Sequence, residues 1–161
     1  MLYIIRHAWA EDRDDTRWPD DDQRPLTDKG RKRFKKQLKK LSKGQFAPAV
    51  IATSPLVRCR ETAELVAQSL ENQPSIVELD ALKPGSDLAA LVAWTVDRTE
   101  GDVAWVGHAP DADRLAAQLV GDGQAAICFA KGAVAAIFFD AAITPGAGEL
   151  QWMATAKLLG V

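Results

Sequence analysis

The chain has 161 residues, of which 47% are hydrophobic and 26% are charged, as is ordinary for a globular domain with a core of its own. Its formal net charge of −2 argues against a general nucleic-acid binder, which would carry a basic excess. No apolar run approaches the roughly 18 residues that span a bilayer, and no basic segment of a signal peptide begins the chain. We therefore expect one domain over residues 1–161, located in the cytoplasm, with neither nucleic acid nor membrane as a partner.

The two cysteines, Cys59 and Cys128, are too few for a disulfide framework, so reduced, structural thiols are expected. A cysteine-based phosphatase needs the pattern Cys-x5-Arg, which lets a loop of amides and one arginine hold the phosphate. Leu65 and Val134 stand where that arginine would be. Neither cysteine is therefore a candidate nucleophile.

The chain opens on an apolar run, residues 2–5, that ends abruptly in Arg6 and His7. This pattern predicts a buried strand whose last residues emerge at the edge of a sheet. A polar segment rich in acids, residues 8–26, follows as an ordered surface loop. Thr27 then offers an N-cap for a helix over residues 28–43, whose run of lysines and arginines between 31 and 40 is either a solvated face or a partner-docking surface.

Further strands and helices alternate along the rest of the chain. Thr53-Ser54-Pro55 predicts a strand end, an N-cap and the first residue of a helix that runs to about Leu70. A later helix should turn Leu88, Leu91, Val92 and Val96 inward, and another begins near Pro110. The expected strands are residues 49–52, 76–79, 103–107, 133–139 and 149–154. This alternation predicts an α/β fold, a three-layer sandwich with a mostly parallel central sheet and helices on both faces.

Polar side chains follow three of the expected strands. Arg6 and His7 end the first strand, Ser54 and Arg58 follow the second, and His108 closes the fourth. In open α/β sheets, ligands bind outside the carboxyl ends of the strands. Guanidinium groups and a helix N-terminus suit phosphate oxygens, and imidazoles titrate near neutrality. Phosphoryl transfer is therefore the chemistry that these residues favour.

Three motifs resemble those of a known family. Arg6-His7-Ala8 resembles the Arg-His-Gly signature of the histidine phosphatase superfamily, which contains phosphoglycerate mutases and acid phosphatases, although Ala8 replaces the usual glycine. Residues 53–62 resemble the second motif of that family, and residues 106–108 resemble the third. Within the superfamily, the chain resembles the phosphohistidine phosphatase (SixA-type) branch most in three features: its short length, residues 24–27 and residues 107–110.

The resemblance, which covers most of the chain, implies a phosphoglycerate mutase-like fold and a role for each matched residue. His7 would be the nucleophile that becomes phosphorylated, and Arg6 and Arg58 would hold the phosphoryl oxygens. His108, with Ala109 beside it, would complete the substrate pocket. Water would then hydrolyse the phosphorylated enzyme. The resemblance implies no metal and no other cofactor.

The substrate class that fits this chain depends on which residue, if any, donates a proton to the leaving group. Other branches supply a carboxylic acid after the third strand, where this chain has Ala81, with Asp80 adjacent as a candidate donor. An alkoxide leaving group needs such an acid, whereas phosphohistidine leaves as the less basic imidazole. The chain also lacks the long insertions of a lid. These features favour a phosphorylated protein (phosphohistidine) over a small phosphorylated substrate. Asp111, near the pocket, has no explanation in the sequence.

Three alternatives stay open at this point. The chain could be a broad small-molecule phosphomonoesterase of the same superfamily, or a binding module for phosphate or phosphohistidine without turnover. Residues 12–16 also fit Asp-x-Asp-x-Thr, the nucleophile motif of the Mg²⁺-dependent haloacid-dehalogenase-type phosphatases. In that family, however, the first aspartate follows an apolar strand directly, and Asp12 does not.

Overall fold

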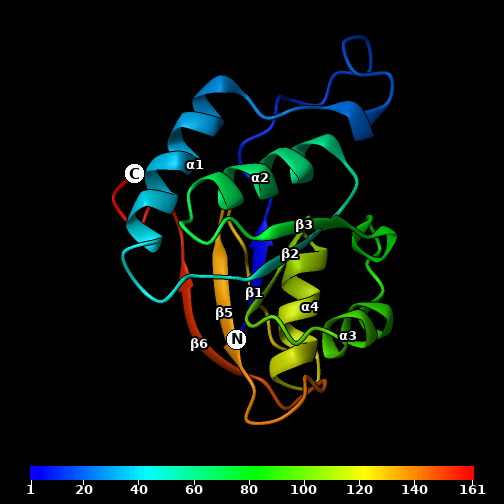
Figure 1. Ribbon diagram of the computed structural model, residues 1–161. Helices are drawn as coiled ribbons and strands as arrows, with labels where there is room; N and C mark the ends of the chain where they lie inside the picture. Colours follow the sequence, from blue (N-terminus) through cyan, green and yellow to red (C-terminus); the bar gives the residue numbers. More distant parts are fainter.

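The computed structural model describes residues 1–161 and contains one six-stranded sheet, in the order β3-β2-β4-β1-β5-β6 (Figure 1). The strands are β1 Leu2–Arg6, β2 Val50–Thr53, β3 Ser75–Glu78, β4 Val103–Gly107, β5 Val134–Phe138 and β6 Glu149–Ala154. Strands β1 to β4 run parallel, β5 is antiparallel to β1, and β6 is antiparallel to β5. The predicted α/β fold with a mostly parallel sheet is confirmed.

Four α-helices and two short 3-10 helices connect the strands. They are α1 Asp28–Leu41, α2 Val57–Gln68, α3 Leu88–Val96 and α4 Asp111–Val120, with η1 Asp21–Gln23 and η2 Asp80–Leu82. Helices α1 and α2 lie together on one side of the sheet, and α3 and α4 lie on the other (Figure 1). No helix has both the length and the apolar character needed to cross a membrane.

Strand β1 divides the core between the two faces, because successive side chains of a strand point to opposite sides. Tyr3 and Ile5 pack with Phe34 and Val66, which belong to α1 and α2. Leu2 and Ile4 pack in the second cluster with Leu115 and Leu119 of α4. Every side chain of β1 up to Ile5 is therefore buried, and the first residue free to leave the core is Arg6.

Two details of the helices differ from the prediction. Helix α2 begins at Val57 rather than at Pro55, and its N-cap residue is Leu56, without a side-chain capping bond. The hydroxyl of Ser54 contacts His108 instead, with 2.9 Å between Ser54 Oγ and His108 Nε2. Val96 is 51% exposed rather than inward, because α3 ends at this residue.

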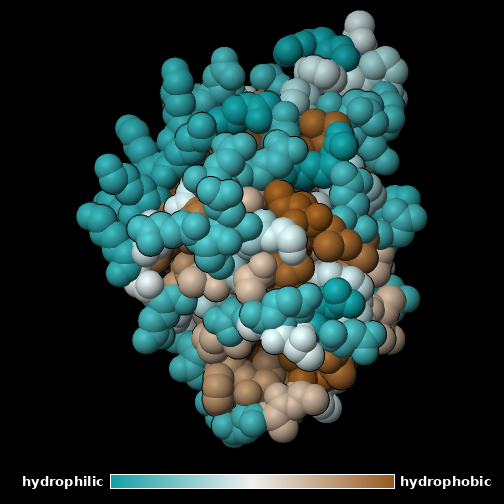
Figure 2. Space-filling model, in the orientation of Figure 1, coloured by the Kyte–Doolittle hydropathy of each residue, from teal (hydrophilic) through white to brown (hydrophobic).

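The basic helix α1 has a solvent-facing row of lysines. Figure 2 shows hydrophilic side chains covering the molecule in the region that α1 occupies in Figure 1. None of these lysines pairs with a carboxylate; they are Lys29, Lys32, Lys35, Lys36, Lys39 and Lys40. The row is exposed, as the interpretation of a solvated face expects.

Candidate active site

A cleft of about 510 Å³ lies at the carboxyl ends of β1 and β4. We call it the cationic cleft. It is lined by Arg6, His7, Arg24, Arg58, Pro84, Gly85, His108, Ala109, Pro110, Asp111 and Lys131. All five residues that the sequence motifs assign to the pocket are among them, so the structure brings Arg6, His7, Arg58, His108 and Ala109 together.

The register of β1 and β4 explains how the two histidines meet. The strands pair in parallel with Arg6 opposite Gly107, so His7 and His108 leave neighbouring strands at the same level. The amide of His7 donates to the carbonyl of Gly107 at 2.9 Å. The two imidazole rings consequently lie close together, with 5.6 Å between their centroids.

His7 is held in one tautomer. Its Nδ1 lies 2.7 Å from the carbonyl oxygen of Ala8, and since a carbonyl oxygen only accepts, Nδ1 carries the proton. The lone pair is therefore on Nε2. Burial lowers the pKa of His7 to about 3, and the positive charges of Arg58 and Arg6 act in the same direction. The ring is therefore neutral at physiological pH.

His108 is also buried and neutral. Burial, together with the nearby Arg58 cation, lowers its pKa to about 4. The Sγ of Cys59 lies 3.5 Å from His108 Nε2. Burial raises the pKa of Cys59 to about 12, so this side chain is a neutral thiol, and neither Cys59 nor Cys128 is in a disulfide. Cys59 thus packs beneath the site as a structural residue.

The two arginines approach the cleft from different elements. Arg6 ends β1 and donates from Nη1 to the carbonyl of Phe129 at 2.6 Å. Arg58 lies in the first turn of α2, where the unpaired amides of a helix start also favour an anion. Its Nη1 donates to the carbonyl of Asp21 at 2.8 Å, and its Nη2 lies 3.2 Å from the Asp21 carboxylate. Burial lowers the pKa of Arg58, which nevertheless stays a cation.

Sequence reasoning missed two cations of the cleft, Arg24 and Lys131. Arg24 Nε donates to Asp21 at 2.8 Å, so one carboxylate lies between two guanidinium groups, and the hydrogen bond from Arg24 lowers the pKa of Asp21. The motif at residues 24–27 was a signal for Arg24. No sequence pattern pointed to Lys131, because it lies in a loop far from every motif.

Asp80, the candidate proton donor, lies outside the residues that line the cleft. It begins η2 with a side chain that is 82% exposed and 3.0 Å from the Nζ of Lys83. Asp111 is the one carboxylate of the cleft, and both of its oxygens are in use. Oδ2 accepts from the Gly85 amide at 2.9 Å and Oδ1 from Arg114 at 2.8 Å. Asp111 therefore fixes the loop around Gly85, which accounts for its presence near the pocket.

The rival Asp-x-Asp-x-Thr motif forms a surface turn. Asp12 is exposed, and Asp14 Oδ1 accepts from the amide of Thr16 at 2.9 Å. None of residues 12–16 lines the cleft. The structure has no group of three or more His, Cys, Asp or Glu residues that could hold a metal ion. Its geometry gives no support to the haloacid-dehalogenase alternative.

Known proteins resemble this chain in sequence and in fold. The family model described as histidine phosphatase superfamily (branch 1) matches residues 2–83, which include Arg6, His7 and Arg58. An uncharacterized protein of Picosynechococcus sp. (strain ATCC 27264 / PCC 7002 / PR-6) is 39% identical over 114 residues, which are 68% of this chain and 67% of that protein.

Two solved structures show the same fold. One is the protein histidine phosphatase SixA complexed with tungstate, with a TM-score of 0.84 and 24% identity over 98% of both chains. The other is a SixA-type protein from Agrobacterium tumefaciens, with a TM-score of 0.76 and 21% identity over 96% of each chain. At these identities the likeness shows the fold, which is the phosphoglycerate mutase-like fold expected from the motifs.

Proposed function

The chain belongs to the histidine phosphatase superfamily (branch 1), and from this premise we propose that it is a metal-independent phosphatase that passes the phosphoryl group through His7 to water. The observation that carries the proposal is the bond between His7 Nδ1 and the Ala8 carbonyl. It leaves Nε2 unprotonated in a ring that burial keeps neutral. A nitrogen with a free lone pair, inside a cationic cleft, is suited to attack phosphorus.

The first step transfers the phosphoryl group to the enzyme. The lone pair of His7 Nε2 forms a bond to phosphorus while the bond from phosphorus to the leaving atom breaks. The leaving atom keeps the electron pair and takes up a proton from solvent water. Arg6, Arg58 and the first turn of α2 would hold the equatorial oxygens, since guanidinium groups match phosphate oxygens in pairs.

The second step releases phosphate. A water oxygen attacks the phosphorus, the bond to His7 Nε2 breaks, and its electron pair returns to the nitrogen as inorganic phosphate forms. The proton that the attacking water gives up passes to solvent, which balances the proton taken up by the leaving group in the first step. His108, 5.6 Å from His7 between ring centroids, would contact the transferring group from the neighbouring strand. Its link to the hydroxyl of Ser54 would hold the imidazole in place during both steps.

We propose a phosphohistidine side chain in a protein as the substrate. The one carboxylate of the cleft, Asp111, is engaged with Gly85 and Arg114, and Asp80 lies outside, so no free carboxylic acid is available to protonate an alkoxide. Imidazole is a far weaker base than an alkoxide and needs less assistance. The fold shared with the SixA structures, one of which is a protein histidine phosphatase with bound tungstate, supports this choice.

The decisive experiment is a substrate panel combined with trapping of the phosphorylated enzyme. A phosphohistidine protein, an aryl phosphate and a phosphoglycerate should be compared with and without EDTA. We expect turnover of the phosphohistidine protein that survives EDTA, and a radiolabelled enzyme that the His7→Ala variant cannot form. Asp80→Asn serves as the matched control and should form the labelled enzyme normally.

Each other result points to a different function. Preference for the aryl phosphate would indicate the small-molecule phosphomonoesterase, and preference for phosphoglycerate would contradict the phosphohistidine substrate while leaving the superfamily unchanged. Phosphate binding without a labelled enzyme would indicate a binding module. Loss of activity in EDTA would overturn the metal-independent mechanism.

A further inference from the structure

Four cations line the cleft, and three of them are engaged within the protein. Arg6 donates to the Phe129 carbonyl, and Arg58 and Arg24 share the carboxylate of Asp21. Lys131 is the exception, because it forms no ion pair and its ammonium group has no hydrogen-bond partner. The one acidic lining residue, Asp111, already serves Arg114 and the Gly85 amide and so does not neutralise it.

Lys131 also stands on a turn that is fixed to the catalytic strand. The Gly132 amide donates to the His7 carbonyl at 3.1 Å, and the Arg6 amide donates to the Ala133 carbonyl at 3.1 Å. The buried Gln37 donates to the Gly132 carbonyl at 2.6 Å. Gly132 has a φ of +72°, and a Cβ there would come within 3.1 Å of the Trp9 ring. The backbone under Lys131 is therefore held in one conformation beside His7.

This placement distinguishes Lys131 from the other lysines. Those of α1 are exposed on a helix face and none of them lines the cleft, so solvation explains them. Lys131 is exposed and lines the cleft in which, by the proposed function, Arg6 and Arg58 hold the phosphoryl oxygens. A flexible ammonium group on a rigid turn can reach an anion that lies next to the phosphoryl group, without competing for the phosphoryl oxygens themselves.

We propose that Lys131 is a specificity residue that binds a second anionic group of the substrate, adjacent to the phosphoryl group. The inference rests on the proposed function, and it narrows the substrate class. The second group is a carboxylate, either of an acidic residue next to the phosphorylated side chain in a protein or of a small molecule. Phosphorylated substrates with this carboxylate bind more tightly than phosphorylated substrates without it. The rates of the two chemical steps are the same for both.

The test measures binding rather than turnover, so it does not depend on the proposed reaction. One arm compares phenylphosphonate with 3- and 4-carboxyphenylphosphonate by calorimetry. The second arm compares two peptides that carry a non-hydrolysable phosphohistidine analogue, one flanked by glutamates and one by glutamines. The proteins are the unmodified chain, Lys131→Ala, Lys131→Arg and the control Lys43→Ala, an exposed lysine outside the cleft.

The unmodified protein should prefer the carboxylated ligand by about threefold to fivefold, the usual size of a solvent-exposed ion pair. The preference should disappear in Lys131→Ala, persist in Lys131→Arg and Lys43→Ala, and shrink as salt is added. A preference confined to the peptide arm identifies a protein side chain as the source of the carboxylate, and one confined to the aryl arm identifies a small molecule.

Equal affinity for both members of each pair, or a preference that survives in Lys131→Ala, would overturn the assignment. These outcomes are separate from a failure of the proposed function. A protein that shows the Lys131-dependent preference but forms no phosphorylated enzyme keeps the binding site and loses the catalytic proposal. A protein that turns over phosphohistidine without the preference keeps the reaction and loses the role of Lys131.

Discussion

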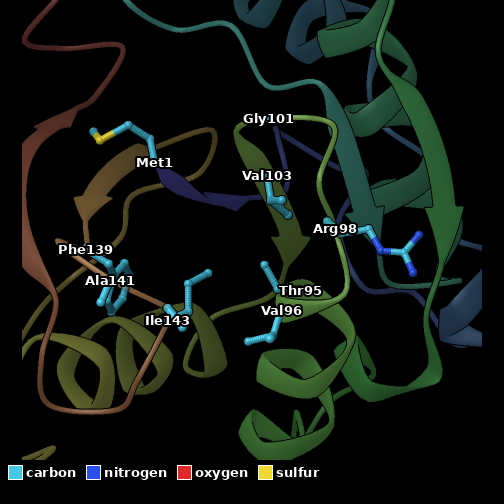
Figure 3. A pocket seen from close by; sticks show the side chains of 10 residues that line it. Met1, Thr95, Val96, Arg98, Gly101, Val103, Phe139, Ala141 and Ile143 are labelled. Carbon is cyan, nitrogen blue, oxygen red and sulfur yellow. The ribbon is translucent and has the colours of Figure 1, made fainter.

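Strands β1 and β4 each border two hollows, one at either end, and these hollows differ completely in chemistry. At the carboxyl ends lies the cationic cleft. At the amino ends lies a smaller hollow of about 200 Å³, which we call the apolar hollow (Figure 3). Met1, Val103, Phe139 and Ile143 are among its lining residues, and its one charged residue, Arg98, lies over the ring of Trp94 at 5.0 Å.

The two hollows differ in whether their polar groups have hydrogen-bond or ion-pair partners inside the protein. In the apolar hollow, Thr95 Oγ1 donates to the Leu91 carbonyl at 2.7 Å and accepts from the Trp105 indole at 3.0 Å, so its hydrogen-bonding capacity is used inside the protein. In the cationic cleft, positive charge exceeds negative charge, and His7 keeps a free ring nitrogen. Unsatisfied polar groups, rather than the presence of a hollow, distinguish the end of the sheet at which we propose the active site.

Removing a guanidinium from the cleft should have the largest effect. Arg58→Ala deletes a guanidinium group that we propose holds the phosphoryl oxygens, and it should lower kcat/KM for the phosphohistidine protein by about 10²–10³-fold. Arg60→Ala is the matched control, because Arg60 belongs to the same helix but pairs with Glu78 at 3.6 Å outside the cleft. Equal losses in the two variants would mean that the effect comes from α2 as a whole.

The buried histidines should make stability depend on pH. Because burial lowers the pKa of His7 to about 3 and of His108 to about 4, the folded protein keeps both rings neutral while the unfolded chain binds protons below its ordinary pKa of 6.5. The free energy of unfolding should therefore fall as the pH falls from about 6.5 toward 4, by up to about 1.4 kcal/mol per pH unit for each histidine. Urea denaturation at several pH values measures this slope, which should be about halved in His7→Gln. An unchanged slope in that variant would contradict the pKa of His7.

A substitution in the apolar hollow should change stability without changing catalysis. Thr95→Val keeps the shape of the side chain but leaves the buried Trp105 indole without an acceptor. The free energy of unfolding should fall by about 1–3 kcal/mol, while kcat/KM stays within about twofold. Thermal or urea unfolding and a standard phosphatase assay measure the two quantities. A tenfold loss of activity in a folded Thr95→Val protein would show that the two ends are coupled.

The smallest effect is expected just outside the cleft. Asp80→Asn removes an exposed carboxylate that pairs with Lys83, so kcat/KM for the phosphohistidine protein and for an aryl phosphate should both stay within about twofold. A selective loss for the aryl phosphate would instead identify Asp80 as a proton donor that reaches the cleft when substrate binds.

Much of the fold could be predicted, because it follows from the pattern of apolar and polar residues that are neighbours in the sequence. The apolar run of β1 and the abrupt change at Arg6 follow from adjacent residues, and the parallel strands then bring His7 and His108 to one edge. The start of α2 could not be predicted, because Ser54 has two uses. Its sequence position suits an N-cap, whereas its hydroxyl faces His108, which is 54 residues away along the chain.

The position of Lys131 and the role of Asp111 could not be predicted for the same reason, because both depend on contacts between distant parts of the chain. Lys131 takes its place from bonds between its turn and β1, and Asp111 takes its role from Gly85, 26 residues earlier. Asp80 is the opposite case: its position after the third strand suggested a proton donor, whereas its side chain is exposed in η2 and does not line the cleft. Long-range contacts of this kind leave no periodic trace in a sequence.

The thiol of Cys59, which is buried next to His108, should be resistant to oxidants and alkylating reagents. A thiol reacts as its thiolate, and with the pKa of Cys59 raised to about 12 almost none is present at neutral pH. Cys128 is exposed and lies outside the residues that line the cleft. Peroxide or iodoacetamide should therefore modify Cys128 while His7 remains free to react. With His7 as the proposed nucleophile, phosphatase activity should survive a treatment that inactivates phosphatases that depend on a cysteine.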